Sequence, residues 1–174
     1  KLKRKYGFDP SKQVIIHVGH CSKGRGLEDF AKIHTAQRLV VASGMFEDEN
    51  VVHVLNEANV KIHKGYLENV EEVYQMADAY LFPTRSTEFV ISIPLSVMEA
   101  LSCGVPVIGY KSFENLNEIT GSEGAITLLD SAEQLDEVLL EVIKKKSDHS
   151  LLEKTGSWSE VAQSVLGMVR EENA

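Results

Sequence analysis

Short runs of apolar, often β-branched residues alternate along the chain with segments whose apolar positions recur every three or four residues. The short runs predict strands buried on both faces, and the longer segments predict amphipathic helices. Strands are expected at 14–18, 39–42, 60–63, 79–82, 105–109 and 125–129. Helices are expected at 26–33, 47–58, 70–77, 94–103 and 131–146, with a loop or short helix at 115–119 and a final helix after Gly156.

The order of these elements predicts the fold class. About six strands separated by helices indicate an α/β, doubly wound, mostly parallel sheet with helices on both faces. No long linker, repeat or low-complexity tract divides the sequence, so we expect one domain over 1–174. Within it, 1–12 is expected to be a linker or helix end, with its cations in solvent, and 157–174 a C-terminal helix. Such sheets bind ligands beyond the carboxyl ends of their strands.

Composition narrows the classes of function. The net charge of −8 over 174 residues argues against general nucleic-acid binding. No run approaches the ~18 consecutive apolar residues of a membrane span, and no signal peptide is visible. Two cysteines, Cys21 and Cys103, suggest no disulfide framework and a cytoplasmic location. Because the sequence begins with Lys1, we expect it to be part of a longer chain.

The stretch 92–109, S-I-P-L-S-V-M-E-A-L-S-C-G-V-P-V-I-G, predicts a short helix, a glycine stop and an apolar strand. The helical period places Leu95, Met98 and Leu101 on an apolar face. Another face, which is polar, carries Ser96, Glu99 and Cys103. A helix N-terminus suits phosphate, and a carboxylate one turn behind it, here Glu99, suits a ribose diol. A solvated glutamate on a core helix is the alternative.

The loop G-H-C-S-K-G-R-G at 19–26 follows the first predicted strand. It departs from the nucleoside-triphosphatase loop, because Arg25 replaces the lysine and Gly26 the hydroxyl residue, and it is not G-x-G-x-x-G. Its cations His20, Lys23 and Arg25 suit a diphosphate. An ordinary solvated loop is the alternative.

The histidines and cysteines suggest no further chemistry. His17 and His20 lie three residues apart but span a strand end and a loop, so we expect no shared metal. The basic loop could lower the pKa of the Cys21 thiol. Without a histidine–acid arrangement around it, we interpret Cys21 as a packing residue. We interpret Cys103 and the stripe around Trp158 in the same way.

Six segments carry a family resemblance: V-I-I-H-V-G-H, K-G-R-G-L-E-D-F, L-V-V-A-S-G, K-G-Y-L-E-N-V-E-E-V-Y-Q-M-A-D-A-Y-L-F-P-T, P-L-S-V-M-E-A-L-S-C-G-V-P-V-I-G and S-W-S-E-V-A. Together they resemble the C-terminal, donor-binding domain of group 1 (family 4) retaining glycosyltransferases of GT-B type. The resemblance covers nearly the whole chain. The fifth segment, following A-D-A-Y-L-F-P-T at this spacing, is its most specific part.

The resemblance implies a site for a nucleotide-diphospho-sugar. His20 and Arg25 would hold the diphosphate, with Lys23 as a further donor, helped by the backbone amides of Leu95 and Ser96. In the family the second glutamate of an E-x7-E pair accepts from the ribose. Glu99 stands at that position and would bind the ribose. The base would face the segment formed by Gly65, Tyr66 and Leu67.

One family residue is missing. The first glutamate of the pair should lie eight residues before Glu99, where this chain has Ile91. An isoleucine cannot bind a sugar hydroxyl. Glu88 is the candidate to replace it as a catalytic-site carboxylate, if the loop from Pro83 to Pro94 bulges.

The function implied by the resemblance is hexosyl transfer from a UDP- or GDP-sugar to a glycan or lipid-linked acceptor. A preceding N-terminal domain would bind the acceptor, so this domain alone should bind the donor without turnover. No metal or other cofactor is expected. The whole protein would be cytoplasmic or peripheral at the inner membrane face. A non-catalytic lobe that binds a nucleotide or a partner protein, and a nucleotide-sugar epimerase of similar fold, are the alternatives.

Overall fold

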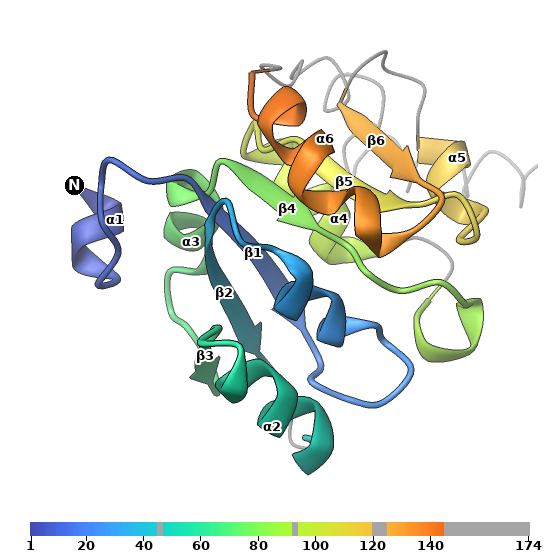
Figure 1. The fold of residues 1–174 in the computed structure, drawn as a ribbon, viewed down its shortest axis with the longest axis horizontal. Helices are drawn as coiled ribbons and strands as arrows, with labels where there is room; N and C mark the ends of the chain where they lie inside the picture. The colour runs from blue at the N-terminus through green and yellow to red at the C-terminus, as the bar shows by residue number, and fades with distance from the viewer. Residues whose placement is uncertain (45–46, 92–93, 120–124, 145–174) are drawn as a thin grey trace, which may run out of the picture.

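The computed structural model describes residues 1–44, 47–91, 94–119 and 125–144. The strands of this part form one sheet in the order β3-β2-β1-β4-β5-β6, and every pair is parallel (Figure 1). The strands are β1 (Val14–Gly19), β2 (Gln37–Ala42), β3 (Lys61–Lys64), β4 (Ala79–Leu81), β5 (Val107–Tyr110) and β6 (Ile126–Leu129). The predicted fold class, a doubly wound α/β sheet, is confirmed. Strands β2 and β3 are added on one side of β1, whereas β4, β5 and β6 are added on the other side, so the order of strands reverses between β1 and β4.

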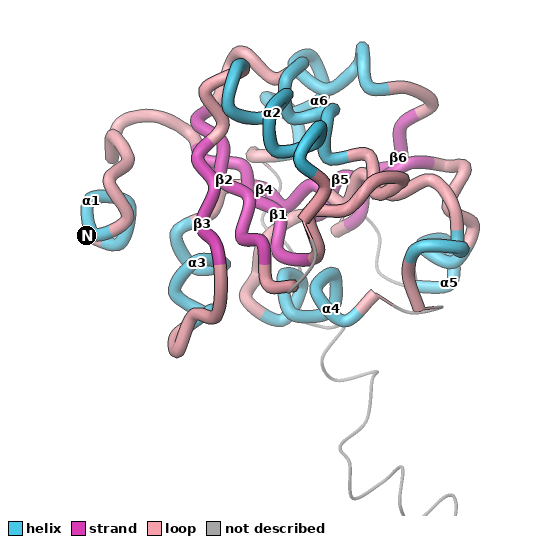
Figure 2. The backbone as a smooth tube through the Cα atoms, turned by 90° about the horizontal axis from the view of Figure 1, so that it is seen from below, coloured by secondary structure: helices cyan, strands magenta, loops and turns pink. Residues whose placement is uncertain are grey.

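Helices cover both faces of this sheet. Figure 2 shows α2 and α6 on one side of the strands, and α3, α4 and α5 on the other. The α-helices are α1 (Leu2–Lys5), α2 (Glu49–Glu57), α3 (Val70–Met76), α4 (Leu95–Ser102), α5 (Asn115–Ile119) and α6 (Leu135–Val142). The 3₁₀ helices are η1 (Leu27–Lys32), η2 (Thr87–Phe89) and η3 (Ala132–Gln134).

The period of the strands divides the core in two. Along β1, Val14 and Ile16 pack toward α3 and α4, whereas Ile15 packs toward η1 and α2. All three side chains are fully buried. Alternate residues of a strand point to opposite faces, so an apolar run such as V-I-I is what a sheet covered on both sides requires.

Local signals explain most element boundaries. The Asp48 carboxylate accepts from the amides of Asn50 and Val51 and begins α2. A capping box formed by Ser131 and Gln134 begins η3, which leads directly into α6. The helix expected at 26–33 is instead the 3₁₀ helix η1, six residues between a left-handed Gly26 and an extended Ile33. The expected helix around Trp158 lies outside the described residues.

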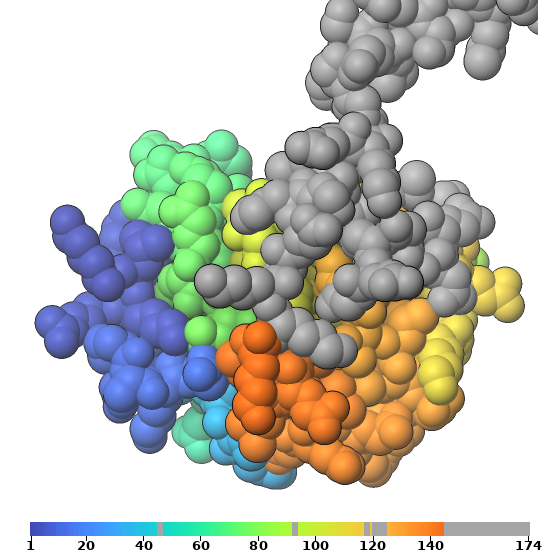
Figure 3. All heavy atoms as spheres, turned by 90° about the horizontal axis from the view of Figure 1, so that it is seen from above, coloured from blue at the N-terminus to red at the C-terminus, as the bar shows by residue number. Residues whose placement is uncertain are grey.

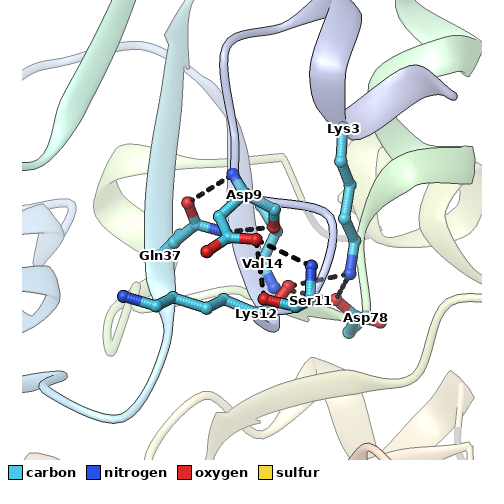
Figure 4. Close-up of polar contacts among 7 residues, drawn as sticks. All are labelled: Lys3, Asp9, Ser11, Lys12, Val14, Gln37 and Asp78. Carbon is cyan, nitrogen blue, oxygen red and sulfur yellow. Dashed lines mark hydrogen bonds and ion pairs between the residues drawn. The ribbon is translucent and has the colours of Figure 1, made fainter.

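The first residues are tied to the sheet rather than free in solvent (Figure 4). The Lys3 ammonium lies 2.6 Å from the Asp78 carboxylate, which also accepts from the amide of Val14 at 2.8 Å. Lys5 and Tyr6 both reach the Glu72 carboxylate on α3. The expectation of solvated cations is therefore wrong for Lys3, whose side chain is 19% exposed. In Figure 3 the first part of the chain (blue) lies at one end of the molecule.

Candidate functional site

A cavity of about 500 Å³ lies beyond the carboxyl ends of β1, β2, β3 and β4, next to the start of α4. The reversal of strand order between β1 and β4 opens such a crevice in a doubly wound sheet. Its lining contains most residues that the sequence singles out. They are Gly19, His20, Arg25, Gly65, Tyr66, Leu67, Ile91, Leu95, Ser96 and Glu99.

The loop after β1 brings Arg25 and His20 to this cavity. Arg25 is half-buried, and its Nε has no hydrogen-bond partner in the described part of the chain. Burial lowers the pKa of the Arg25 guanidinium, because the charge loses water. No carboxylate among the described residues forms an ion pair with it. His20 is exposed and lies against Gly44, where a Cβ would come within 2.1 Å of its Nδ1. The loop thus offers an unpaired cation to an anionic ligand.

The start of α4 forms another wall. Pro94 is the N-cap and supplies no side-chain acceptor, so the amides of Leu95 and Ser96 have no partner within the helix. The Ser96 Oγ lies 2.8 Å from the hydroxyl of Tyr80, which also lies 3.2 Å from the Val18 carbonyl. This wall therefore presents free amides and a hydroxyl held by a buried strand residue.

The apolar face predicted for α4 is partly wrong. Leu95 is 64% exposed and lines the cavity, whereas Val97, Ala100 and Leu101 are buried. The first turn borders the cavity beyond the strand ends, so Leu95 has no sheet to pack against. Cys103 is half-buried and packs against the edge of the core, as its interpretation as a packing residue implies.

Glu99 follows one turn behind and has a specific partner. It is exposed on α4, and its Oε2 accepts a hydrogen bond of 2.6 Å from the hydroxyl of Tyr74 on α3. Tyr74 is only 1% exposed. The Glu99 carboxylate is therefore exposed to the cavity while a buried hydroxyl, that of Tyr74, donates to it.

The segment after β3 closes the far side of the cavity. Gly65 has a φ of 95°, a left-handed conformation that turns the chain. Tyr66 follows with 86% of its side chain exposed, and Leu67 is half-buried. This segment presents backbone and one aromatic ring to the space in front of the sheet.

Two residues of the sequence-based site lie elsewhere. Lys23 lines a neighbouring hollow of about 480 Å³ with Phe89 and Arg85, and not the main cavity. Gly24 has a φ of 84°, and a Cβ there would come within 2.5 Å of Phe89, so the two loops touch. Glu88 is exposed on η2 and is not part of the cavity lining. Ile91, 61% exposed, occupies the rim instead.

A buried polar group anchors the loop after β4. Asp29 is 7% exposed, and its Oδ2 accepts from Arg85 at 2.8 Å and from the hydroxyl of Tyr110 at 2.7 Å. The Arg85 guanidinium lies 3.8 Å from the centre of the Tyr110 ring. These contacts hold the chain that leads from β4 to Ile91 and α4.

His17 lies beneath the cavity, within β1. It is fully buried and stacked on Tyr80, with 5.7 Å between ring centres. Burial lowers its pKa to about 4, so the imidazole is neutral at neutral pH. Its Nδ1 lies 3.0 Å from the Leu81 carbonyl, the geometry of an N–H donor, while its Nε2 has no described partner.

Tyr74, Tyr80 and His17 belong to this region but were not among the residues predicted for the site. The signal that could have found His17 and Tyr80 is an imidazole or hydroxyl inside an apolar run, as in V-I-I-H-V and A-D-A-Y-L, and Tyr74 carries no such signal. A buried phenol or imidazole needs a hydrogen-bond partner. Cys21 is buried, and burial raises the pKa of its thiol to about 11, opposite to the effect considered for the basic loop.

Comparison with known families decides the relationship. A family model described as "Glycosyl transferases group 1" matches residues 12–145. The chain belongs to the group 1 glycosyltransferases. No described helix of this glycosyltransferase domain has the length and apolar character that a membrane crossing requires. Among the same residues, no three histidine, cysteine or acidic side chains are grouped as metal ligands would be.

Individual proteins resemble this chain in sequence or in fold. The N-acetyl-alpha-D-glucosaminyl L-malate synthase of Bacillus anthracis is 30% identical over 119 residues, which cover 63% of this chain and 30% of that protein. The sucrose-phosphate synthase of Thermosynechococcus elongatus has a similar fold, with a TM-score of 0.73 at 16% identity over 98% of this chain and 48% of that one. A glycosyltransferase from Rickettsia africae also has a similar fold, with a TM-score of 0.58 at 13% identity over 94% of this chain and 50% of that one. The chain thus spans half the length of these proteins or less.

Proposed function

We propose that this chain is the C-terminal, donor-binding domain of a retaining glycosyltransferase of GT-B type, and that it binds a UDP- or GDP-hexose. The observation that carries the proposal is that Arg25, the start of α4 and Glu99 all line the same cavity. A diphosphate needs cations and amide donors, and a ribose needs an acceptor beside them. The cavity offers both, about one helical turn apart.

Each part of the donor has a proposed partner. Arg25, His20 and the amides of Leu95 and Ser96 would bind the diphosphate, and Glu99 the ribose hydroxyls. The segment from Gly65 to Leu67 would face the base. When the glycosidic bond breaks, negative charge grows on the diphosphate, and donors fixed around it would stabilise that charge.

The acceptor side belongs to the rest of the protein in this proposal. The chain covers 30% of its curated relative and about half of the structures that resemble it. A second domain, N-terminal to this one, would bind the glycan or lipid-linked acceptor, and transfer would occur between the two. The isolated domain would then bind the donor without turnover. The proposal includes a cytoplasmic location and requires no metal.

Calorimetry and thermal shifts with UDP, GDP, ADP and NAD test the proposal on the 174-residue chain. A nucleotide at one hundred times its dissociation constant should stabilise the fold by ~2.7 kcal/mol. Glu99→Gln should weaken UDP or GDP binding about tenfold or more, because it replaces a charged acceptor. Glu141→Gln, at an exposed glutamate on α6, is the matched control. Absence of binding by every nucleoside diphosphate would overturn the proposal.

Ile91 favours a second candidate, a lobe that binds a nucleotide without catalysis. It stands where the family resemblance implies a carboxylate, and its side chain lies on the cavity rim. The full-length protein, incubated with donor and an acceptor extract, separates the candidates. Sustained donor consumption that depends on acceptor excludes the non-catalytic lobe, and consumption without acceptor would indicate an epimerase.

A further inference from the structure

A buried phenol holds the carboxylate that faces the cavity. The Tyr74 hydroxyl donates to Glu99 Oε2 across 2.6 Å, from α3 to α4. The two side chains differ sharply in environment, because Tyr74 is 1% exposed whereas Glu99 is exposed and lines the cavity. The contact thus joins the core to the surface of the candidate site.

The phenol is fixed by its surroundings. Its ring packs in the core beside Tyr80, with 5.9 Å between ring centres and an angle of 39°. Burial raises the pKa of the Tyr74 hydroxyl far above its ordinary value, so it stays a hydrogen-bond donor throughout the working pH range. A donor that cannot move or ionise selects one orientation of the acceptor.

This restraint matters because the Glu99 side chain is exposed. Its three side-chain torsions would otherwise allow many orientations, and ordering them upon ligand binding costs affinity. An ionised carboxylate has about four acceptor positions, so one bond to Tyr74 leaves capacity for two ligand hydroxyls. The carboxylate is preorganised to accept from a diol.

We propose that the Tyr74 hydroxyl is a positioning group that, through Glu99, makes the site selective for a ribose with both hydroxyls over a deoxyribose. This inference rests on the proposed function, since it assigns Glu99 to the sugar of the nucleotide. Tyr74 itself need not touch the ligand. The chemical class selected is a ribonucleoside diphosphate.

The experiment measures affinities of UDP, GDP and their 2′-deoxy and 3′-deoxy forms for Tyr74→Phe, which removes one oxygen atom. We expect UDP or GDP to bind about tenfold more weakly, and the deoxy forms to change less than about twofold, so that the preference for ribose collapses. Tyr6→Phe is the matched control. Its hydroxyl also donates to a glutamate, Glu72 at 3.0 Å, and Tyr6 is not part of the cavity lining.

A double-mutant cycle gives the second measurement. If Tyr74 acts through Glu99, then Tyr74→Phe in a Glu99→Ala background should change UDP or GDP affinity less than about twofold. Melting temperatures without nucleotide establish that each variant is folded. An unchanged preference for ribose in Tyr74→Phe, or equal losses in both backgrounds, would overturn the positioning role alone. Wild-type protein that binds no nucleoside diphosphate would overturn the proposed function and this inference together.

Discussion

The hydroxyl of Tyr80, on the buried strand β4, lies 2.8 Å from the Oγ of Ser96 in the first turn of α4. Tyr80 is fully buried, and its oxygen also lies 3.2 Å from the Val18 carbonyl at the end of β1. One phenol therefore links two strands to the helix start that borders the cavity. The sheet sets where the amides of α4 point.

Tyr80→Phe should lower the free energy of unfolding by about 1 kcal/mol, because it removes the hydrogen-bond partner shared by the Val18 carbonyl and the Ser96 hydroxyl. Urea denaturation measures this change. Tyr66→Phe removes the same atom from a ring that is 86% exposed, and it should alter stability by less than ~0.5 kcal/mol. Equal effects of the two substitutions would show that the Tyr80 hydroxyl does not anchor α4.

His17 should make stability depend on pH. An unfolded histidine has a pKa near 6.5, whereas burial lowers the pKa of His17 to about 4. As pH falls, the unfolded state takes up the proton first, so the contribution of His17 is complete above about pH 6.5 and is lost between about 6.5 and 4. The expected loss is about 3 kcal/mol.

The comparison of wild type with His17→Phe, in urea unfolding at a series of pH values, isolates this effect. Phenylalanine loses the hydrogen bond to the Leu81 carbonyl and should cost about 1 kcal/mol at neutral pH. The difference between the two proteins should shrink or reverse toward pH 4, because the variant cannot take up this proton. A constant difference across the series would contradict the neutral, buried imidazole.

A comparison of Arg25 with Lys23 distinguishes diphosphate binding in the cavity from binding in the hollow beside it. Both cations belong to the loop after β1, but only Arg25 lines the cavity. Arg25→Gln should therefore weaken UDP or GDP binding about tenfold or more, and Lys23→Gln less than about threefold. Calorimetry at two ionic strengths checks the comparison, since the salt dependence of binding should fall mainly in the Arg25 variant. A larger loss in the Lys23 variant would move the diphosphate to the neighbouring hollow.

The sequence predicted the sheet well because strand signals here are local. Runs such as V-I-I-H-V need burial on both faces whatever their neighbours are. The order of strands and helices then places the loops after β1 and β3 and the start of α4 at one edge. Glu99 could be singled out for the same reason, because it stands one turn inside a helix that begins at that edge.

Pairs that are distant in sequence could not be predicted in this way. The contact between Tyr74 and Glu99 spans 25 positions and depends on how α3 packs beside α4. The exposure of Leu95 depends on how far α4 extends past the strands. The helical period predicts which face a residue lies on, but it does not predict that distance. Lys23 looked equivalent to Arg25 because charge pattern ignores the direction in which a turn sends a side chain.

Ile91 allows the incomplete half of the site to be tested directly. Its side chain is 61% exposed on the cavity rim, so Ile91→Glu should change the free energy of unfolding by less than ~0.5 kcal/mol. If this position faces the donor sugar, the new carboxylate can accept from its hydroxyls. UDP-glucose or GDP-mannose should then bind about five- to tenfold more tightly relative to UDP or GDP.

Two control variants separate hydrogen bonding from charge. Ile91→Gln carries an acceptor without the charge and should give a smaller gain, because bonds to neutral acceptors are weaker. Glu88→Gln should leave the ratio unchanged, since Glu88 lies on η2 and is not part of the cavity lining. If the carboxylate introduced by Ile91→Glu lies near the diphosphate without touching the sugar, it should instead weaken nucleotide and nucleotide-sugar equally. That result would place the sugar away from Ile91 and leave Glu99 as the acidic residue of this site that contacts the donor.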